Sequence, residues 1–185
     1  MNTPEKKSYL YKERDEEERA EFVEQIKGYA PERFVYVDEA GVDDTIDYPY
    51  GYAHKSERYQ AEKLGHKTQR ISFISGWWKG ETIAPLTFEG YCNTQLFCQW
   101  MEECFVPELI PGQIVLIDNA SFHPKERIKE LVKQAGCQVI FLPKYSPDLN
   151  KIEKFWARLK NEISKLKRHV EKLSDAVREA FRRLS

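Results

Sequence analysis

Alternating apolar and polar positions predict strands in several parts of the chain. The segment FVYVD places successive side chains on opposite faces and predicts a strand that ends at Asp38. Residues 70–78 are rich in β-branched and aromatic side chains, and a Lys-Gly turn connects them to residues 81–90, which predicts a hairpin. Short apolar runs within residues 113–120 and 137–143 predict two further strands.

A helical period predicts the remaining elements. Residues 12–28 carry a thin apolar stripe in a highly charged segment, so we expect a short amphipathic helix that ends at Gly28. Apolar residues between Asn93 and Pro107 fall on one helical face, with Asn93 as the N-cap. Further elements are expected at 124–134 (helix), from Ser146-Pro147 to about Leu166 (long helix), at 173–184 (helix) and at 50–53 (short strand).

The order of these elements is strand, hairpin, helix, strand, helix, strand, helix and helix. Early antiparallel strands followed by alternating helices and strands are typical of an α/β fold, in which helices flank a mixed central sheet. A chain of 185 residues, 41% of them hydrophobic, is long enough to bury a full core.

Composition argues against a membrane-spanning or disulfide-rich protein. The longest apolar runs have four residues, whereas a membrane helix needs roughly 20, and the N-terminus lacks the apolar segment of a secretory leader. The cysteines form no C-x-x-C pair and have no histidine at zinc-finger spacing; they are Cys92, Cys98, Cys104 and Cys137. We expect a soluble cytoplasmic protein whose cysteines act as small hydrophobic residues.

The net charge of −1 hides an uneven distribution. Residues 151–185 contain 11 Lys and Arg against 5 Asp and Glu, a local charge of +6, which leaves −7 for residues 1–150. A basic C-terminal third suits a nucleic-acid backbone, although a solvated helix face has the same composition. Charge alone does not decide between these alternatives.

Two aspartates stand out by their position. Asp38 and Asp118 each follow a four-residue apolar run at a predicted strand end, which is where α/β sheets gather ligands. If the two strands are parallel neighbours, both carboxylates can share one cation, which would offset their desolvation. An Asp at a strand end can also form a turn or cap a helix. Glu39 points to the other face of the strand and is left out of this group.

Glu153 is a third candidate, in the first turns of the expected long helix. It lies one residue, and therefore roughly 100°, from Ile152 on the apolar face, so its carboxylate should flank the surface that packs on the sheet. Compensation of the helix dipole is the alternative role. A pair with a Lys at i+4 is disfavoured, because that residue is Ala157.

The segments FVYVDEAG, IVLIDNASFHP and FLPKYSPDLNKIEKFWARLK together resemble the catalytic segments of DDE transposases in the bacterial insertion-sequence branch of the mariner-like superfamily. The likeness runs from about Arg33 to Lys165, and the 34 residues from 119 to 152 match that branch's interval between its second Asp and its Glu. The family often has Pro where this chain has Lys151, which should cost some rigidity in the first helical turn. The resemblance implies a ribonuclease H-like fold, with three antiparallel strands followed by parallel strands.

The resemblance also implies metal-dependent cleavage and strand transfer of DNA at transposon ends. Asp38, Asp118 and Glu153 would hold two Mg²⁺ ions, for which Mn²⁺ can substitute. Asp38 would bridge the two ions, and the other two acids would each hold one. Two ions can clamp both oxygens of an in-line phosphoryl displacement, and Mg²⁺ prefers hard oxygen ligands. The implied partners are transposon-end DNA and target DNA, bound by a homodimer.

The expected DNA contacts lie close to these acids in sequence and are Asn119, His123, Lys144, Tyr145, Lys151, Lys154 and Arg158. Basic and aromatic groups there can position phosphates. His123 has two alternatives to a phosphate contact: it can support a metal ligand or cap the following helix. Tryptophans 77, 78 and 156 are expected in the core or at a dimer contact and not stacked on bases.

This interpretation divides the chain into an N-terminal helical extension (1–30), the catalytic domain (31–168) and a C-terminal basic helix (169–185). Two other functions stay open: a different ribonuclease H-like nuclease, and a domesticated remnant that binds DNA without catalysis. Only about 32 residues precede the first strand. We therefore expect the helix-turn-helix region that recognises transposon ends in longer relatives to be missing from this sequence.

Overall fold

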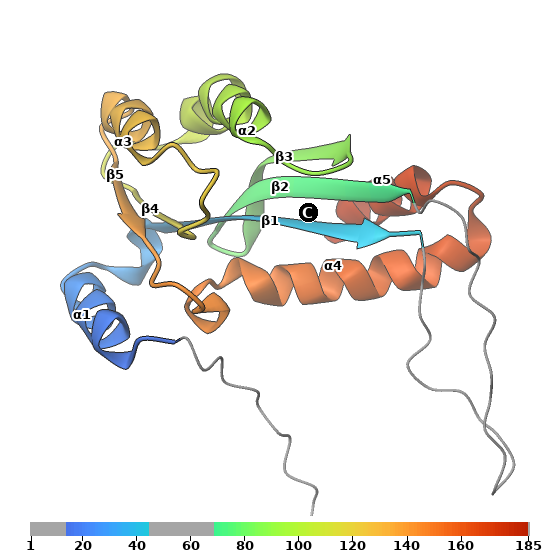
Figure 1. Ribbon diagram of the computed structural model, residues 1–185. Coiled ribbons are helices and arrows are strands. Elements are labelled where there is room, and N and C mark those ends of the chain that lie inside the picture. The colour runs from blue at the N-terminus through green and yellow to red at the C-terminus, as the bar shows by residue number, and fades with distance from the viewer. Residues whose placement is uncertain (1–13, 45–68, 185) are drawn as a thin grey trace, which may run out of the picture.

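A five-stranded mixed sheet forms the centre of the computed structural model, which describes residues 14–44 and 69–184 (Figure 1). The strands are β1 (Phe34–Asp43), β2 (Arg70–Trp78), β3 (Glu81–Glu89), β4 (Ile114–Ile117) and β5 (Gln138–Phe141). Their order across the sheet is β3-β2-β1-β4-β5. The first three are antiparallel, and β4 and β5 run parallel to β1, which confirms the predicted mixed sheet.

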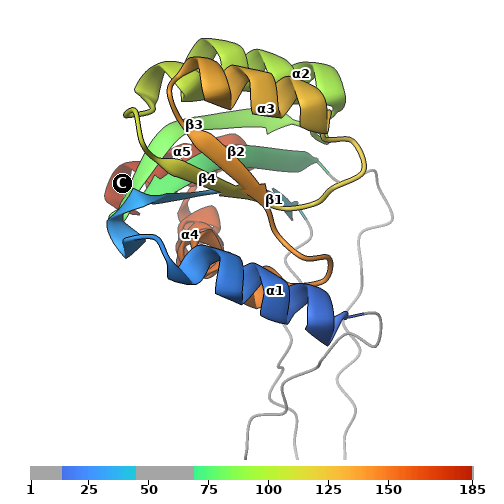
Figure 2. The ribbon, with the colours of Figure 1, turned by 90° about the vertical axis from the view of Figure 1, so that its left-hand side faces the viewer.

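Helices cover both faces of this sheet, as Figure 2 shows. They are α1 (Glu16–Lys27), α2 (Thr94–Trp100), α3 (Lys125–Gln134), α4 (Ile152–Leu166) and α5 (Leu173–Leu184). Helices α2 and α3 pack on one face, whereas α1, α4 and α5 pack on the other. The expected helix from 93 to 107 begins as α2 and continues through a π turn (Met101–Phe105) and a 3₁₀ turn (Val106–Glu108).

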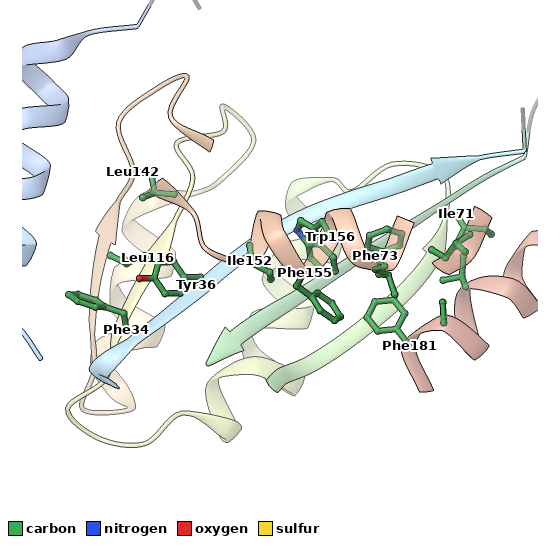
Figure 3. Close-up of a cluster of buried hydrophobic side chains, with 14 of the residues drawn as sticks. Phe34, Tyr36, Ile71, Phe73, Leu116, Leu142, Ile152, Phe155, Trp156 and Phe181 are labelled. Carbon is green, nitrogen blue, oxygen red and sulfur yellow. The ribbon is translucent and has the colours of Figure 1, made fainter. Parts of the chain in front are cut away.

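Alternate residues of β1 enter two separate hydrophobic cores. Phe34 and Tyr36 face the core beneath α1, α4 and α5, and Val35 and Val37 face the core beneath α2 and α3. Figure 3 shows the first core, in which Trp156 of α4 lies among aromatic rings from β2 and α5. The expected C-terminal basic helix therefore shares its core with α4.

The first strand does not end at Asp38, as the sequence pattern predicted. It continues to Asp43, because β2 pairs with it over this whole stretch and places Ser75 opposite Asp38. The parallel pairing with β4, however, stops at Val37 and Ile117. Asp38 therefore lies where β1 loses its neighbour on one side and a polar side chain can reach open space.

The long helix begins at Ile152 and not at the Ser-Pro pair where it was expected. Residues 147–149 form a separate 3₁₀ turn, and Asn150 is extended, with φ −93° and ψ 105°. Lys151 then has φ −66°, the value that a proline imposes. The chain thus adopts the backbone that the family's Pro would set, although nothing in the Lys side chain enforces it.

Several smaller expectations have clear outcomes. The Asn93 side chain accepts a hydrogen bond from the backbone N–H of Leu96 at 2.9 Å and so caps α2. All four cysteines are free. The candidate strand at residues 50–53 lies outside the described residues. Within the described part of the chain, no helix is both long and apolar enough to cross a membrane.

Candidate active site

The three acids singled out in the sequence line one cavity of about 370 Å³. Asp38 comes from β1, Asp118 directly follows β4, and Glu153 is the second residue of α4. The parallel pairing of β1 with β4 brings the two aspartates to the same edge of the sheet, as expected for neighbouring strands. The other walls of the cavity are Asn119, Ala120, Leu142, Pro143, Lys144, Tyr145, Ser146, Pro147 and Asn150.

Asp38 lies on the α4 face of the sheet in strongly anionic surroundings. Burial, followed by repulsion from Glu153, Glu39 and Asp118, raises the pKa of Asp38 to about 8. The indole Nε1 of Trp156 donates a hydrogen bond to Asp38 Oδ2 at 3.1 Å. Among the described residues, no Lys, Arg or His forms an ion pair with Asp38 or Glu153. Partly buried carboxylates without a cation of the described chain, as at Asp38 and Glu153, fit an external divalent cation.

Asn150 connects the start of α4 to β1. Its side chain is buried, and Nδ2 donates a hydrogen bond to the carbonyl oxygen of Val37 at 3.2 Å. The Oδ1 atom is buried and has no hydrogen-bond partner within the described residues. Asn150 therefore holds α4, and with it Glu153, next to Asp38. Sequence reasoning missed this residue, although it lies three positions before Glu153 in the segment that carries the family resemblance.

His123 lies behind Asp118 on the α2/α3 face of the sheet. Its Nε2 is 2.9 Å from Glu39 Oε1, and its Nδ1 is 3.0 Å from Asp118 Oδ1. The His123 side chain has no exposed surface, so its placement favours support of a metal ligand over contact with a DNA phosphate. It does not cap α3, whose N-cap is Pro124. Glu39 lies on the face opposite Asp38, as the strand alternation predicted.

Three of the remaining expected DNA contacts lie at the cavity. Asn119, Lys144 and Tyr145 line the cavity. Tyr145 is 49% exposed and has a left-handed backbone, with φ 54°. A residue with a large side chain rarely adopts this conformation, so it stores strain at the mouth of the site.

The first turns of α4 carry exposed cations at Lys151, Lys154 and Arg158. The structure pairs none of them with an acid in residues 14–44 or 69–184; Lys151 instead lies over the Tyr36 ring at 5.5 Å. In contrast, other basic side chains of the C-terminal third are held in ion pairs, among them Lys165, Lys167, Arg182 and Arg183. Lys151, Lys154 and Arg158 therefore leave positive charge without an acid partner at the start of α4, the helix that carries Glu153.

The cavity wall is also held from α1. Arg19 is 8% exposed and donates hydrogen bonds to both carboxylate oxygens of Asp148. Nη1 lies 3.1 Å from Oδ1, and Nη2 lies 2.7 Å from Oδ2. This contact lowers the pKa of Asp148. Asp148 belongs to the 3₁₀ turn that leads into α4. Through Arg19, α1 therefore holds in place the segment that precedes Glu153.

The three tryptophans of interest occupy structural positions. Trp156 is 1% exposed, and Trp77 stacks on Phe155 with 4.7 Å between ring centroids. Trp78 donates its indole N–H to the carbonyl oxygen of Glu32 at 2.6 Å. The expected core location is confirmed for Trp156, which in addition supports Asp38.

Comparison with solved structures yields Mos1 transposase complexes as similar folds. The Mos1 strand transfer complex aligns with a TM-score of 0.63 and 14% identity over 99% of this chain and 63% of that chain. The Mos1 mariner paired end complex with Mn gives 0.62 and 14%, over 99% and 64%. The Mos1 transposase catalytic domain with raltegravir and Mg gives 0.56 and 12%, over 91% and 79%. The chain thus spans slightly under two thirds of the first two proteins.

At these identities, the structural likeness shows a shared ribonuclease H-like fold. No curated protein has a sequence that matches this chain. Residues 33–176 match the family described as DDE superfamily endonuclease, and they include Asp38, Asp118 and Glu153. This chain therefore belongs to the DDE superfamily endonucleases.

Proposed function

We propose that this chain is the catalytic domain of a transposase, which cuts DNA at transposon ends and joins it to target DNA. One observation carries the proposal: three acids from three separate elements line a single cavity, and no cation of the described residues pairs with Asp38 or Glu153. Membership of the DDE endonuclease family and the fold shared with Mos1 transposase support it.

The acids suit a divalent metal, which DDE endonucleases require. We infer two Mg²⁺ ions, with Asp38 shared between them and Asp118 and Glu153 each holding one. When bound, such ions activate the attacking oxygen and stabilise the leaving oxygen of a phosphoryl displacement. Burial, followed by repulsion from neighbouring acids, raises the pKa of Asp38, and the attraction of a bound cation for the carboxylate would lower it again.

The chain's own residues supply positioning. Trp156 directs one oxygen of Asp38 through its indole N–H, which leaves the other oxygen for the cavity. Asn150 fixes the start of α4, and Arg19 fixes the turn before it through Asp148. These contacts hold acids from different elements at a constant separation, which a preorganised site needs.

We propose that DNA approaches across the first turns of α4. Lys144 lines the cavity, Lys151 directly follows the lining residue Asn150, and Lys154 and Arg158 continue the exposed positive charge along α4. Unpaired exposed cations can neutralise phosphates without first breaking an ion pair. On this proposal, residues 31–168 form the catalytic unit, which acts in the cytoplasm as a homodimer on DNA of the nucleoid.

A joining assay tests the proposal. The purified chain is incubated with Mg²⁺ or Mn²⁺, a supercoiled plasmid and a labelled duplex that ends in a free 3′-hydroxyl. We expect metal-dependent nicking and covalent transfer of label to the plasmid, and neither product from Asp118→Asn. Glu81→Gln, at an exposed acid of β3, is the matched control and should behave as wild type. Hydrolysis without joining would indicate another nuclease, and an RNA–DNA hybrid tested in parallel would identify a ribonuclease H.

A further inference from the structure

Glu39 and His123 form a buried charged chain that ends on Asp118 and that the proposed mechanism leaves unused. We propose that both are positioning residues, which orient the Asp118 carboxylate toward the divalent cation from the opposite side of the sheet. The inference rests on the proposed function, because it concerns the same metal site.

The geometry places a carboxylate at each end of one imidazole ring. His123 Nε2 lies 2.9 Å from Glu39 Oε1, and Nδ1 lies 3.0 Å from Asp118 Oδ1 and 3.5 Å from the Asp118 carbonyl oxygen. An ionised carboxylate only accepts hydrogen bonds, so both ring nitrogens donate when Glu39 and Asp118 are charged. The contact with Glu39 then determines which way the ring faces.

The contact with His123 covers one oxygen of the Asp118 carboxylate and leaves the other open to the cavity. Its Oδ1 is buried and has no well-aligned hydrogen-bond donor in the described structure, so the ion pair with His123 is its electrostatic partner. The side chain as a whole is nevertheless 43% exposed. The exposure therefore falls on the rest of the carboxyl group, and Oδ2 is left for a ligand in the cavity.

Aromatic packing makes this orientation rigid. The His123 side chain has no exposed surface, and its ring centroid lies 4.3 Å from that of Phe97 and 4.4 Å from that of Phe122. Phe97 comes from α2, and Phe122 from the segment between β4 and α3. Glu39 comes from β1, so the chain of contacts also connects β1 to the segment that carries Asp118.

A positive charge on the His123 ring would offset the repulsion among the acids of the site. A protonated ring 3.0 Å from Asp118 Oδ1 would reduce the repulsion of Asp118 from Asp38 and Glu153. Outer partners of metal ligands commonly contribute about 10- to 100-fold to metal affinity or activity.

A purely structural role makes a different prediction. If Glu39 and His123 only tie β1 to the segment after β4, their loss should lower thermal stability and leave metal affinity in the folded protein unchanged. If they position Asp118, metal affinity should fall in a protein that is still folded. The measurement must therefore separate Mn²⁺ binding from metal-free stability.

Calorimetric titration of the metal-free full chain with Mn²⁺ separates them. Glu39→Gln keeps the shape and one acceptor oxygen but removes the charge, and we expect Mn²⁺ to bind about 10-fold more weakly. His123→Gln should weaken binding by about 10- to 100-fold. The double variant should bind no more weakly than His123→Gln alone, because Glu39 acts through the ring. Circular dichroism and metal-free melting confirm the fold, and Glu81→Gln is the control.

The outcomes separate this inference from the proposed function. If Glu39→Gln is folded and binds Mn²⁺ within about twofold of wild type, the inference is overturned and the proposed function stands. Fully additive losses in the double variant would also overturn it, because Glu39 would then act independently of His123. If the wild-type chain binds no Mn²⁺, the proposed function itself fails. Should His123→Gln not fold, the isosteric Glu39→Gln still decides the question.

Discussion

Asp38 and Glu39 are neighbours in sequence, but they lie on opposite faces of β1 in different electrostatic surroundings. Asp38 faces α4, accepts a hydrogen bond from Trp156 and is surrounded by other acids. Glu39 faces α2 and α3 and is paired with His123. Burial raises the pKa of both carboxyls, but His123 offsets part of the rise for Glu39. On one face of the strand, Asp38 therefore has no cation partner among the described residues, whereas on the other face Glu39 is paired with His123.

The sharpest test of this difference removes one negative charge from each face. Asp38→Asn should abolish metal-dependent DNA cleavage, by more than ~10³-fold, which corresponds to ~4 kcal/mol of transition-state stabilisation. Glu39→Gln should reduce the rate by about 10-fold, since it acts only through His123. Initial rates of plasmid nicking measure both. Equal losses in the two variants would show that the two faces do not differ in this way.

The pH dependence of stability tests whether Asp38, on the α4 face, is buried without a positively charged partner. The pKa of Asp38 in the folded protein, about 8, lies above its ordinary value of 3.8. The folded state therefore keeps a proton that the unfolded chain releases, so the stability of the metal-free protein should fall as pH rises from about 4 to about 8. We expect the melting temperature to drop by at least ~5 °C over this interval.

Mg²⁺ should reverse this trend, because it favours the ionised carboxylates. The effect would appear as a rise in melting temperature that grows with pH, and Asp38→Asn should reduce both the pH dependence and the response to metal. A pH profile of wild type that rises from 4 to 8 without metal would contradict the assignment of Asp38 as an unpaired buried acid.

Asn150 tests whether the α4 face depends on its anchoring to β1. In Asn150→Ala, the Val37 carbonyl loses its donor and α4 loses its connection to the strand that carries Asp38. We expect a loss of about 1–2 kcal/mol in the free energy of unfolding, measured by urea denaturation. Cleavage should fall further than this loss of stability explains, by about 10-fold, because Glu153 is displaced. Unchanged cleavage by a folded Asn150→Ala protein would remove Asn150 from the site.

The smallest expected effect concerns DNA binding on the two faces. Lys154→Ala and Arg158→Ala, on α4, should each weaken binding of a nonspecific duplex and reduce the slope of log K against log [salt] by about 1. Lys133→Ala removes an exposed lysine of α3, on the other face, and should leave the slope unchanged. Fluorescence anisotropy in Ca²⁺ across a salt series measures all three. Similar slopes for the α3 and α4 variants would contradict an approach of DNA over α4.

Much of the fold follows from local pattern. The hairpin of β2 and β3, the Asn93 cap and the apolar face of α4 were predicted from residue spacing alone, because strand and helix periods depend on near neighbours in sequence. The parallel pairing of β1 with β4 was only a condition of the sequence argument, and the structure supplies it. The predicted ends of elements were less accurate. β1 runs on past Asp38 because β2 extends beside it, and the pairs beyond Asp38 join residues 27 to 35 positions apart.

The same division applies to the site. The sequence by itself determined which acids stand out, since Asp38 and Asp118 follow buried strands, and it determined that Glu39 faces away from Asp38. The tertiary structure alone decided that His123 is enclosed by aromatic rings between Glu39 and Asp118, and that Asn150 reaches Val37. The physical reason is that the burial and pairing of polar groups depend on contacts between segments far apart in the sequence. A local pattern of residues does not determine these contacts.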